Sequence, residues 1–222
     1  MATKLNFDEL NRLEKVKKSR KYPMPMPYRE YFGAMYITPE EMRKRMSLAE
    51  EIEDVMLWVF AYWLIAAEAE ISKEELKQDA EAKLTSVIAK HTVLDPYLEK
   101  HISDVINEVV DSTEKHTQDG ESEEASYWTS RDRAMLISEN EANAFEEYTK
   151  FREAKAQGKT KKTWITELDD KVRLTHTLAE GQTVDIDGLF FIGGSEMRFP
   201  KDTEYNPDPS EIVNCRCTCE YK

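Results

Sequence analysis

The last sixty residues, from Thr163 to Lys222, constrain the fold most, because their apolar positions fall into short segments separated by turn residues. Three of the seven glycines lie in the run from Gly188 to Gly194, and all three cysteines follow it. Segments this short must pair in a sheet or pack on a helix to be stable. The stretch therefore predicts a small mixed unit of helix and strand.

The start of this stretch has the pattern of a helix. Thr163 is a suitable N-cap, and an apolar stripe follows at helical spacing. The stripe is formed by Trp164, Ile165, Leu168 and Val172. Asp169, Arg173 and His176 fall at i, i+4 and i+7, so they are expected to share another face. Gly181 is expected to end this helix or the turn after it.

Two strand patterns follow. Apolar residues flank Asp187-Gly188, a dipeptide that favours a tight hairpin turn, and Gly193-Gly194 allows a second bend. The segment from Ile212 to Tyr221 alternates as a strand does, which would place Cys215, Cys217 and Cys219 on one face and Asn214 and Arg216 on the other. Phe199-Pro200 is expected to end strand pairing at an edge.

The preceding residues predict helices with recognisable start signals. Thr38-Pro39, Ser72 with Glu75, and Asp95-Pro96 each combine an N-cap residue with a favourable first turn. A long helix is predicted from Arg131 to Gln157, with Gly158 at its C-cap. The fold class is therefore α+β, with a mainly helical N-terminal region followed by a small C-terminal domain of long helix, second helix and short antiparallel sheet.

Composition divides the chain into four parts. Residues 1–29 form a basic, proline-containing arm, 30–111 a helical region, 112–126 an acidic linker of almost no apolar content, and 127–222 the C-terminal domain. The arm carries eight Lys or Arg against three acids, a balance of +5 in a chain of net charge −13. An acidic body argues against a protein that coats nucleic acid, while a basic end suits contact with DNA or an acidic partner.

Cysteine count and hydropathy indicate in which cellular compartment the protein is made and whether it crosses a membrane. Three cysteines cannot all pair within one chain, and the N-terminus lacks a secretory apolar region, so we expect synthesis in a reducing cytoplasm. The longest apolar run, Val55 to Ala67, is shorter than the roughly 20 residues a membrane span needs. We therefore expect no membrane partner and a buried helix at this run.

The C-terminal part of the sequence contains an ordered set of short motifs that resembles a known family. The order K-T-W-I-T, D-D-x-V-R-x-x-H, a glycine turn, a hairpin, F-P and N-C-R-C resembles the C-terminal domain of tailed-phage minor head proteins, the Mu-F-like head-morphogenesis family. The resemblance begins near Arg131 and covers about the last ninety residues. Ser138-Glu139 stands where the family usually has threonine-glutamate, and Cys219 lies outside the core pattern. The residues carrying the resemblance are Trp164, Asp169, Asp170, Arg173, His176, Gly181, Phe190, Pro200, Asn214, Cys215, Arg216 and Cys217.

The resemblance implies a non-enzymatic minor capsid protein that acts in head morphogenesis. Its implied partners are the portal protein and capsid or scaffold proteins, and its implied location is the virion interior near the portal, after assembly in the host cytoplasm. Contact with packaged or exiting DNA, at ejection, would be non-specific. We place DNA or portal contact at the two basic clusters, formed by Arg12, Lys15, Lys17, Lys18, Arg20, Lys21, Lys159, Lys161 and Lys162. Relatives can carry a toxin domain after this unit, and because this chain ends at Lys222 we expect no appended effector.

Two chemical interpretations of the same residues remain as alternatives. His176 with Cys215, Cys217 and Cys219 could bind zinc, but alternate strand positions lie about 6.6 Å apart, an awkward spread for one tetrahedral ion. Buried structural thiols without a cofactor are favoured, and a disulfide stays open. The second alternative is a small nuclease or toxin-like effector, with His176 as general base, Asp169 or Asp170 orienting it and Arg173 holding phosphate. A structural role for these side chains is favoured over catalysis.

Overall fold

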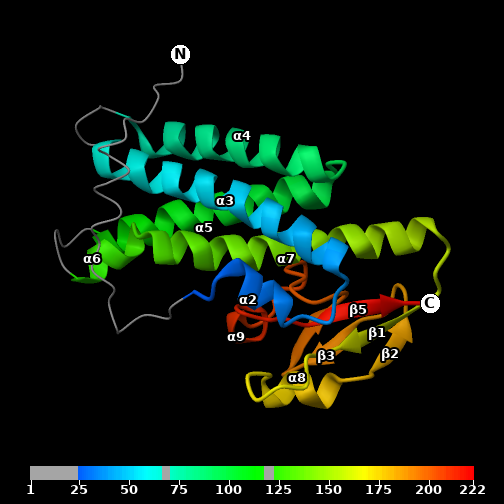
Figure 1. Cartoon of the computed structure of the whole chain (residues 1–222). Coiled ribbons are helices and arrows are strands. Elements are labelled where there is room, and N and C mark those ends of the chain that lie inside the picture. The colour runs from blue at the N-terminus through cyan, green and yellow to red at the C-terminus, as the bar shows by residue number, and fades with distance from the viewer. Residues whose placement is uncertain (1–24, 67–70, 118–122) are drawn as a thin grey trace. The chain divides into compact units, whose positions relative to one another are not determined.

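The computed structural model describes residues 25–66, 71–117 and 123–222, and its fold class is α+β, as the sequence predicts (Figure 1). The chain divides into two compact units. The first contains Glu50–Ser138, and the second combines Met26–Ala49 with Glu139–Lys222. The predicted arm, 1–29, lies largely outside the described residues, and the predicted domain bounds stay a prediction.

The start signals of the helices are confirmed. Helix α3 (Pro39–Ala66) begins after Thr38, whose Oγ1 accepts a hydrogen bond from Glu41 N at 3.2 Å, while Glu41 Oε2 accepts one from Thr38 N at 2.8 Å. Helix α4 (Lys73–His91) has the same reciprocal arrangement between Ser72 and Glu75. Helix α5 (Pro96–Thr117) begins after Asp95, whose Oδ1 accepts from Leu98 N at 3.0 Å. Each cap satisfies backbone groups that the first helical turn leaves without partners.

The first unit is helical. Helices α4 and α5 pack against each other, and α5 also contacts the short helix α6 (Glu123–Trp128); Figure 1 shows α3, α4 and α5 side by side. The apolar run of α3 places Phe60 fully in the core. The guanidinium of Arg133 lies 5.0 Å from the centre of the Phe60 ring and 4.4 Å from the centre of the Trp128 ring. Its Nη1 donates a hydrogen bond to Thr113 Oγ1 at 2.6 Å. The prediction that the aromatic helix lies in a bundle core is confirmed for Phe60.

The predicted acidic linker, 112–126, is helical at both ends. Helix α5 continues to Thr117 and α6 begins at Glu123, while 118–122 lie outside the described residues. The helix continues because Thr113 is buried and bonds Val109 and Arg133, so polar residues here still contribute to packing. Helix α7 (Arg131–Ala156) follows as predicted, and Gly158, at φ +74°, turns the chain after it.

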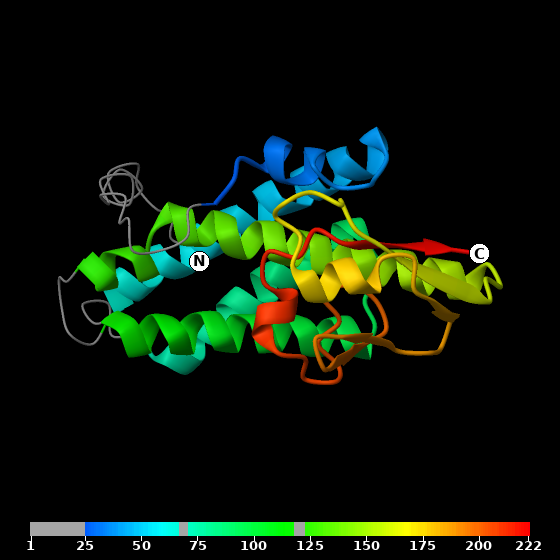
Figure 2. The same ribbon diagram turned by 90° about the horizontal axis from the view of Figure 1, so that it is seen from below.

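The second unit contains the strands. Its elements are α2 (Tyr28–Gly33), β1 (Lys161–Ile165), α8 (Leu174–Ala179), β2 (Thr183–Asp185), β3 (Phe190–Ile192), β4 (Ser195–Met197), α9 (Pro209–Ile212) and β5 (Thr218–Tyr221). One antiparallel sheet has the order β2-β1-β5, and β3 and β4 form a separate hairpin. The end of α7 lies along β5, as Figures 1 and 2 show, and Thr218 Oγ1 donates to Glu147 Oε1 at 2.6 Å.

The predicted helix from Thr163 is wrong. Lys161–Ile165 is the central strand, with Thr163 opposite Thr183 on one side and Trp164 opposite Cys219 on the other. The segment is rich in β-branched and aromatic residues, and strands β2 and β5 supply hydrogen bonds to it on its two sides. Together these favour a strand more than the single capping signal at Thr163 favours a helix. Only Leu174–Ala179 is helical, so Asp169 precedes the helix and shares no helical face with His176.

Two further predictions for this region are wrong. The hairpin turn is formed by Gly193-Gly194, at φ +59° and +90°, because β2 and β3 belong to different sheets and Asp187-Gly188 merely connects them. The cysteine strand is confined to Thr218–Tyr221, so only Cys219 of the three cysteines lies in it. Asn214, at φ +57°, interrupts the extended backbone before Cys215.

Candidate functional site

The cysteines and the histidine of the sequence motif meet in the core of the second unit. His176 comes from α8, and Cys215 and Cys217 from the irregular segment between α9 and β5. His176 Nδ1 lies 3.2 Å from Cys217 Sγ and 3.6 Å from Cys215 Sγ, and all three side chains are buried. Cys219 is buried too, but it lies in β5, where its backbone N–H donates to Glu147, and it is not part of this cluster.

The other ring nitrogen of His176 is held by Glu211. Its Nε2 lies 3.0 Å from Glu211 Oε2, which also accepts a hydrogen bond from Thr175 Oγ1 at 2.8 Å. Since a carboxylate accepts hydrogen bonds, Nε2 carries a proton in this arrangement, and Nδ1 is directed at the two sulfurs. The imidazole is 1% exposed, and the Trp164 ring contacts it edge-on at 5.7 Å.

Glu211 is the site residue that sequence reasoning missed. It belongs to α9, which starts with Asp208 as N-cap and Pro209 in its first turn. This is the signal that correctly located α5 at Asp95-Pro96, and it would have indicated a helix here. Glu211 reaches His176 across Gly193, where an added Cβ would lie 2.1 Å from Glu211 Oε1.

The cysteine segment is fixed by side chains from two helices. The Cys215 carbonyl oxygen accepts hydrogen bonds from Tyr31 Oη of α2 and from Asn143 Nδ2 of α7, both at 3.0 Å. These bonds replace the ladder bonds that a strand would have supplied. They hold Cys215 and Cys217 in position against His176.

The two thiols of the cluster have opposite pKa shifts. A hydrogen bond from Cys217 and the neighbouring His176 hold the pKa of Cys215 well below its usual range, although burial opposes this. The hydrogen bond to Cys215 and burial raise the pKa of Cys217, while Trp164 acts in the opposite direction. Burial lowers the pKa of His176, but the hydrogen bond to Cys215 and its charge outweigh burial and raise it. The cluster therefore favours one thiolate, at Cys215.

The remaining motif residues do not converge on His176. Asp169 binds Arg216 at 2.7 Å, and this bond lowers the pKa of Asp169 although burial opposes it. Arg173 donates to the Val213 carbonyl, linking the start of α8 to the segment after α9. Asp170 is exposed. The predicted role of Asp169 or Asp170 in orienting His176 is wrong, because Glu211 occupies that position.

The other motif residues serve the core or its turns. Trp164 and Phe190 are fully buried with ring centroids 5.2 Å apart, and Pro200 is buried beside Phe199. Gly181 adopts φ +72° after α8, as expected, and Asn214 is exposed. Arg216 was expected on the face opposite the cysteines, but it is buried with them.

The predicted basic contacts divide in two groups. Lys159 is half-buried, and Lys161 is exposed and pairs with Asp185 at 2.8 Å. Lys162 is fully buried between the rings of Phe151 and Phe190, and burial lowers its pKa to about 8, so its predicted contact with DNA or portal is wrong. The N-terminal cluster (Arg12, Lys15, Lys17, Lys18, Arg20, Lys21) lies outside the described residues.

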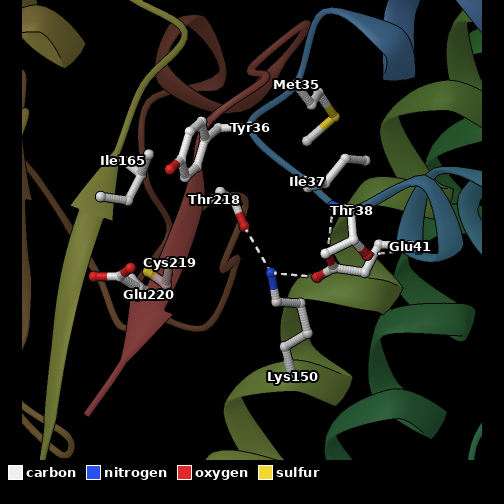
Figure 3. A pocket seen from close by; sticks show the side chains of 10 residues that line it. All are labelled: Met35, Tyr36, Ile37, Thr38, Glu41, Lys150, Ile165, Thr218, Cys219 and Glu220. Carbon is white, nitrogen blue, oxygen red and sulfur yellow. Dashed lines mark hydrogen bonds and ion pairs between the residues drawn. The ribbon is translucent and has the colours of Figure 1, made fainter.

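A cavity of about 390 Å³ lies beside β5 (Figure 3). Lys150 of α7 points into it between Glu41, at 2.9 Å, and Thr218, at 3.0 Å. Burial opposes ionisation of Glu41, yet hydrogen bonds from Lys150 and Thr38 lower its pKa to about 2. The lysine is thus already paired with an acid, and the cavity walls are otherwise largely apolar.

Comparison with known proteins gives one partial match. The chain is 36% identical over 102 residues to the NAD(+)–arginine ADP-ribosyltransferase EFV of Enterococcus faecalis, which is 44% of this chain and 20% of that protein. The chain thus matches about a fifth of the length of this relative. No family model matches the chain, and neither does any solved structure. Within the described ranges, no helix combines the length and the apolar character that crossing a membrane requires.

Proposed function

We propose that this chain is a minor head protein of a tailed phage or prophage, and that its second unit is a binding module without catalytic activity. The observation that carries the proposal is the placement of the motif residues. Trp164, His176, Cys215 and Cys217 form the centre of one small unit, and Arg173 links two of its elements. A motif that builds a fold, rather than one that processes a substrate, is what a structural virion protein needs.

The geometry around His176 supports a non-catalytic role. Both ring nitrogens have partners, and the ring is 1% exposed. The cavity beside it measures about 10 Å³, whereas pockets for small molecules span roughly 300–1,000 Å³. A general base must reach the proton it removes, and no nucleotide can approach His176 in this arrangement.

The proposed partners are the portal protein and capsid or scaffold proteins, in the virion interior. The basic residues before Met26 would contact the portal or packaged DNA, with Lys159 and Lys161 as a second basic site. The acidic remainder of the chain would limit binding along the genome.

Charge reversal tests the proposed contact. The variant carries Glu at Lys15, Lys17, Lys18 and Lys21, and its control carries Glu at four exposed lysines of the helical parts. The control positions are Lys44, Lys90, Lys100 and Lys115. We expect the first variant alone to lower incorporation into virions, measured by quantitative mass spectrometry, and to reduce the salt dependence of DNA binding. Equal incorporation and equal salt dependence in both variants would remove this assignment.

The rival proposal is an enzyme, either a small nuclease using Asp169, Arg173 and His176 or a transferase similar to its longer relative. The partial match is the reason to test for transferase activity, but four fifths of that relative lie outside the matched region. His176→Ala separates the rival from the head protein. We expect loss of stability and neither nucleic-acid cleavage nor ADP-ribosyl transfer to arginine from NAD in the unmodified chain. Turnover that disappears in His176→Ala with an unchanged melting temperature would establish the enzyme instead.

A further inference from the structure

The His176 cluster has the composition and spacing of a metal site. Nδ1 of His176 and the sulfurs of Cys215 and Cys217 all lie within 4.8 Å of one another. In a tetrahedral zinc site, with Zn–S near 2.3 Å and Zn–N near 2.0–2.1 Å, nitrogen and sulfur ligands lie about 3.6 Å apart. The observed separations between Nδ1 and the two sulfurs are 3.2 and 3.6 Å.

The two cysteines of the cluster do not have the strand geometry that disfavours a zinc site. They are not at alternate positions of one strand, because Cys215 and Cys217 precede β5 and converge on one histidine nitrogen. Cys219 belongs to the strand and faces Glu147. The ligand set is therefore two thiolates and one imidazole, which suits zinc among the available first-row metals.

The surroundings of the cluster match those of a metal-bound histidine. Such histidines nearly always donate their second ring nitrogen to a carboxylate or carbonyl, and Glu211 takes this position at 3.0 Å from Nε2. This contact leaves the Nδ1 lone pair directed at the sulfurs. The buried indole Nε1 of Trp164 makes no hydrogen bond of normal geometry within the described part of the chain, and the Trp164 ring contacts the His176 ring edge-on at 5.7 Å.

A fourth coordination position is available beside the cluster. The cavity of about 10 Å³ is lined by His176, Cys215, Cys217 and Glu167, and also by the basic residues Lys171, Arg173 and Arg216. That volume is close to what one water molecule occupies. Glu167 Oε1 is buried and lacks a hydrogen-bond partner among the described residues. A buried carboxylate oxygen without a donor is costly, and a cation or its bound water beside it would remove that cost.

We propose that His176 Nδ1, Cys215 Sγ and Cys217 Sγ bind a structural Zn²⁺, with Glu211 orienting the imidazole and a water molecule in the cavity at Glu167 as the fourth ligand. Binding displaces the remaining thiol protons to solvent, so the ion meets two thiolates. The ion would join α8 to the segment between α9 and β5, two parts of the unit that share no sheet ladder. This site is independent of the proposed head function, because it concerns the folding of the second unit alone.

The main test is the metal content of the full chain, purified under reducing conditions without added chelator. We expect an equimolar amount of zinc by inductively coupled plasma mass spectrometry. Cys215→Ser and Cys217→Ser should lose the metal, whereas Cys219→Ser, which removes an equally buried thiol outside the cluster, should retain it. Glu211→Gln should weaken zinc binding roughly 10- to 100-fold, and Glu220→Gln, at an exposed position of β5, should not.

A second measurement needs no variant and so holds even if the serine variants fail to fold. Replacing zinc in the unmodified chain by Co²⁺ should produce the absorption of cobalt–thiolate charge transfer, and chelation should abolish it together with part of the thermal stability. Metal-free protein that neither takes up zinc nor gives this spectrum would overturn the proposal. A Cys215–Cys217 disulfide in protein prepared without reductant, found by intact mass and resistant to exchange for zinc after reduction, would overturn it as well.

Discussion

Arg45 and Glu147 form an ion pair 2.6 Å long in which both side chains are fully buried. Arg45 lies near the start of α3 and Glu147 in the second half of α7. The same carboxylate accepts hydrogen bonds from Thr218 Oγ1 at 2.6 Å and from the Cys219 backbone at 3.3 Å. One buried acid thus joins two helices and the edge strand of the second unit.

Removing one member of this pair is expected to be strongly destabilising. Glu147→Gln leaves the Arg45 charge buried without an anion, which costs about 3–5 kcal/mol of unfolding free energy. Urea denaturation of the full chain measures the change. Asp104→Asn is the control, because it breaks an exposed pair with Lys100, for which about 0–1 kcal/mol is expected. Equal losses in the two variants would contradict a special role for the buried pair.

The helical part of the fold was predictable because its signals are local. Ser72 and Glu75 cap α4 within a few residues, and Asp95-Pro96 starts α5 without help from distant residues. Strand β1 was not predictable in this way. Lys161–Ile165 is a strand because β2 and β5 pair with it from some twenty and sixty residues away along the chain.

The site was predictable in its members but not in its contacts. His176, Cys215 and Cys217 were recognised by residue type, and they do meet. Asp169 was assigned to the wrong partner, because a helical register was assumed where the chain turns, and it binds Arg216 instead. Glu211 has no motif of its own, and its role depends on the close approach to Gly193, which only the tertiary structure reveals.

Glu139 predicts a pH dependence of stability. It is buried in α7, and burial raises its pKa to about 8, although Lys201 acts in the opposite direction. The unfolded chain loses this proton near pH 4.5, whereas the folded chain holds it until about pH 8. The folded state therefore binds more protons in this window, and stability falls as the pH rises through it.

Glu139→Gln should remove this fall, since the amide stays neutral. The variant should gain stability over the unmodified chain as the pH rises from about 4.5 to 8, by an amount on the order of a few kcal/mol. Urea midpoints at intervals across this range give the difference curve. Lys201, whose pKa burial lowers to about 8, changes stability only above the window, so it does not mask the effect. A flat difference curve would mean that Glu139 ionises normally.

The capping box of α4 predicts a modest, local effect. Ser72 Oγ accepts from Glu75 N at 3.2 Å, and Glu75 Oε2 accepts from Ser72 N at 2.9 Å. Ser72→Ala removes the first bond and should cost about 1 kcal/mol. Ser86→Ala, at an exposed position within the same helix, should change stability by less than about 0.5 kcal/mol. Hydrogen exchange of the first turn of α4 should speed up in Ser72→Ala only.

Alanine substitutions at Gly193 and Gly194 distinguish the cost of backbone strain from the cost of a clash with Glu211. Both have positive φ, +59° and +90°, so alanine at either position costs about 1–2 kcal/mol. At Gly194 no atom of the described residues lies within 4 Å of an added Cβ, whereas at Gly193 it would meet Glu211 Oε1 at 2.1 Å and Cδ at 2.5 Å. Gly193→Ala must therefore displace Glu211 from His176, and we expect it to lose clearly more stability than Gly194→Ala.

A double-mutant cycle makes the origin of this difference measurable. In a Glu211→Ala background the obstructing carboxylate is absent, so Gly193→Ala should cost no more than Gly194→Ala. The coupling free energy between positions 193 and 211 should then be large, while that between 194 and 211 should be near zero. Urea unfolding of the six chains (unmodified, three single and two double variants) provides both values. Additive losses at positions 193 and 211 would show that the close approach of Glu211 to Gly193 is not what positions the carboxylate against His176.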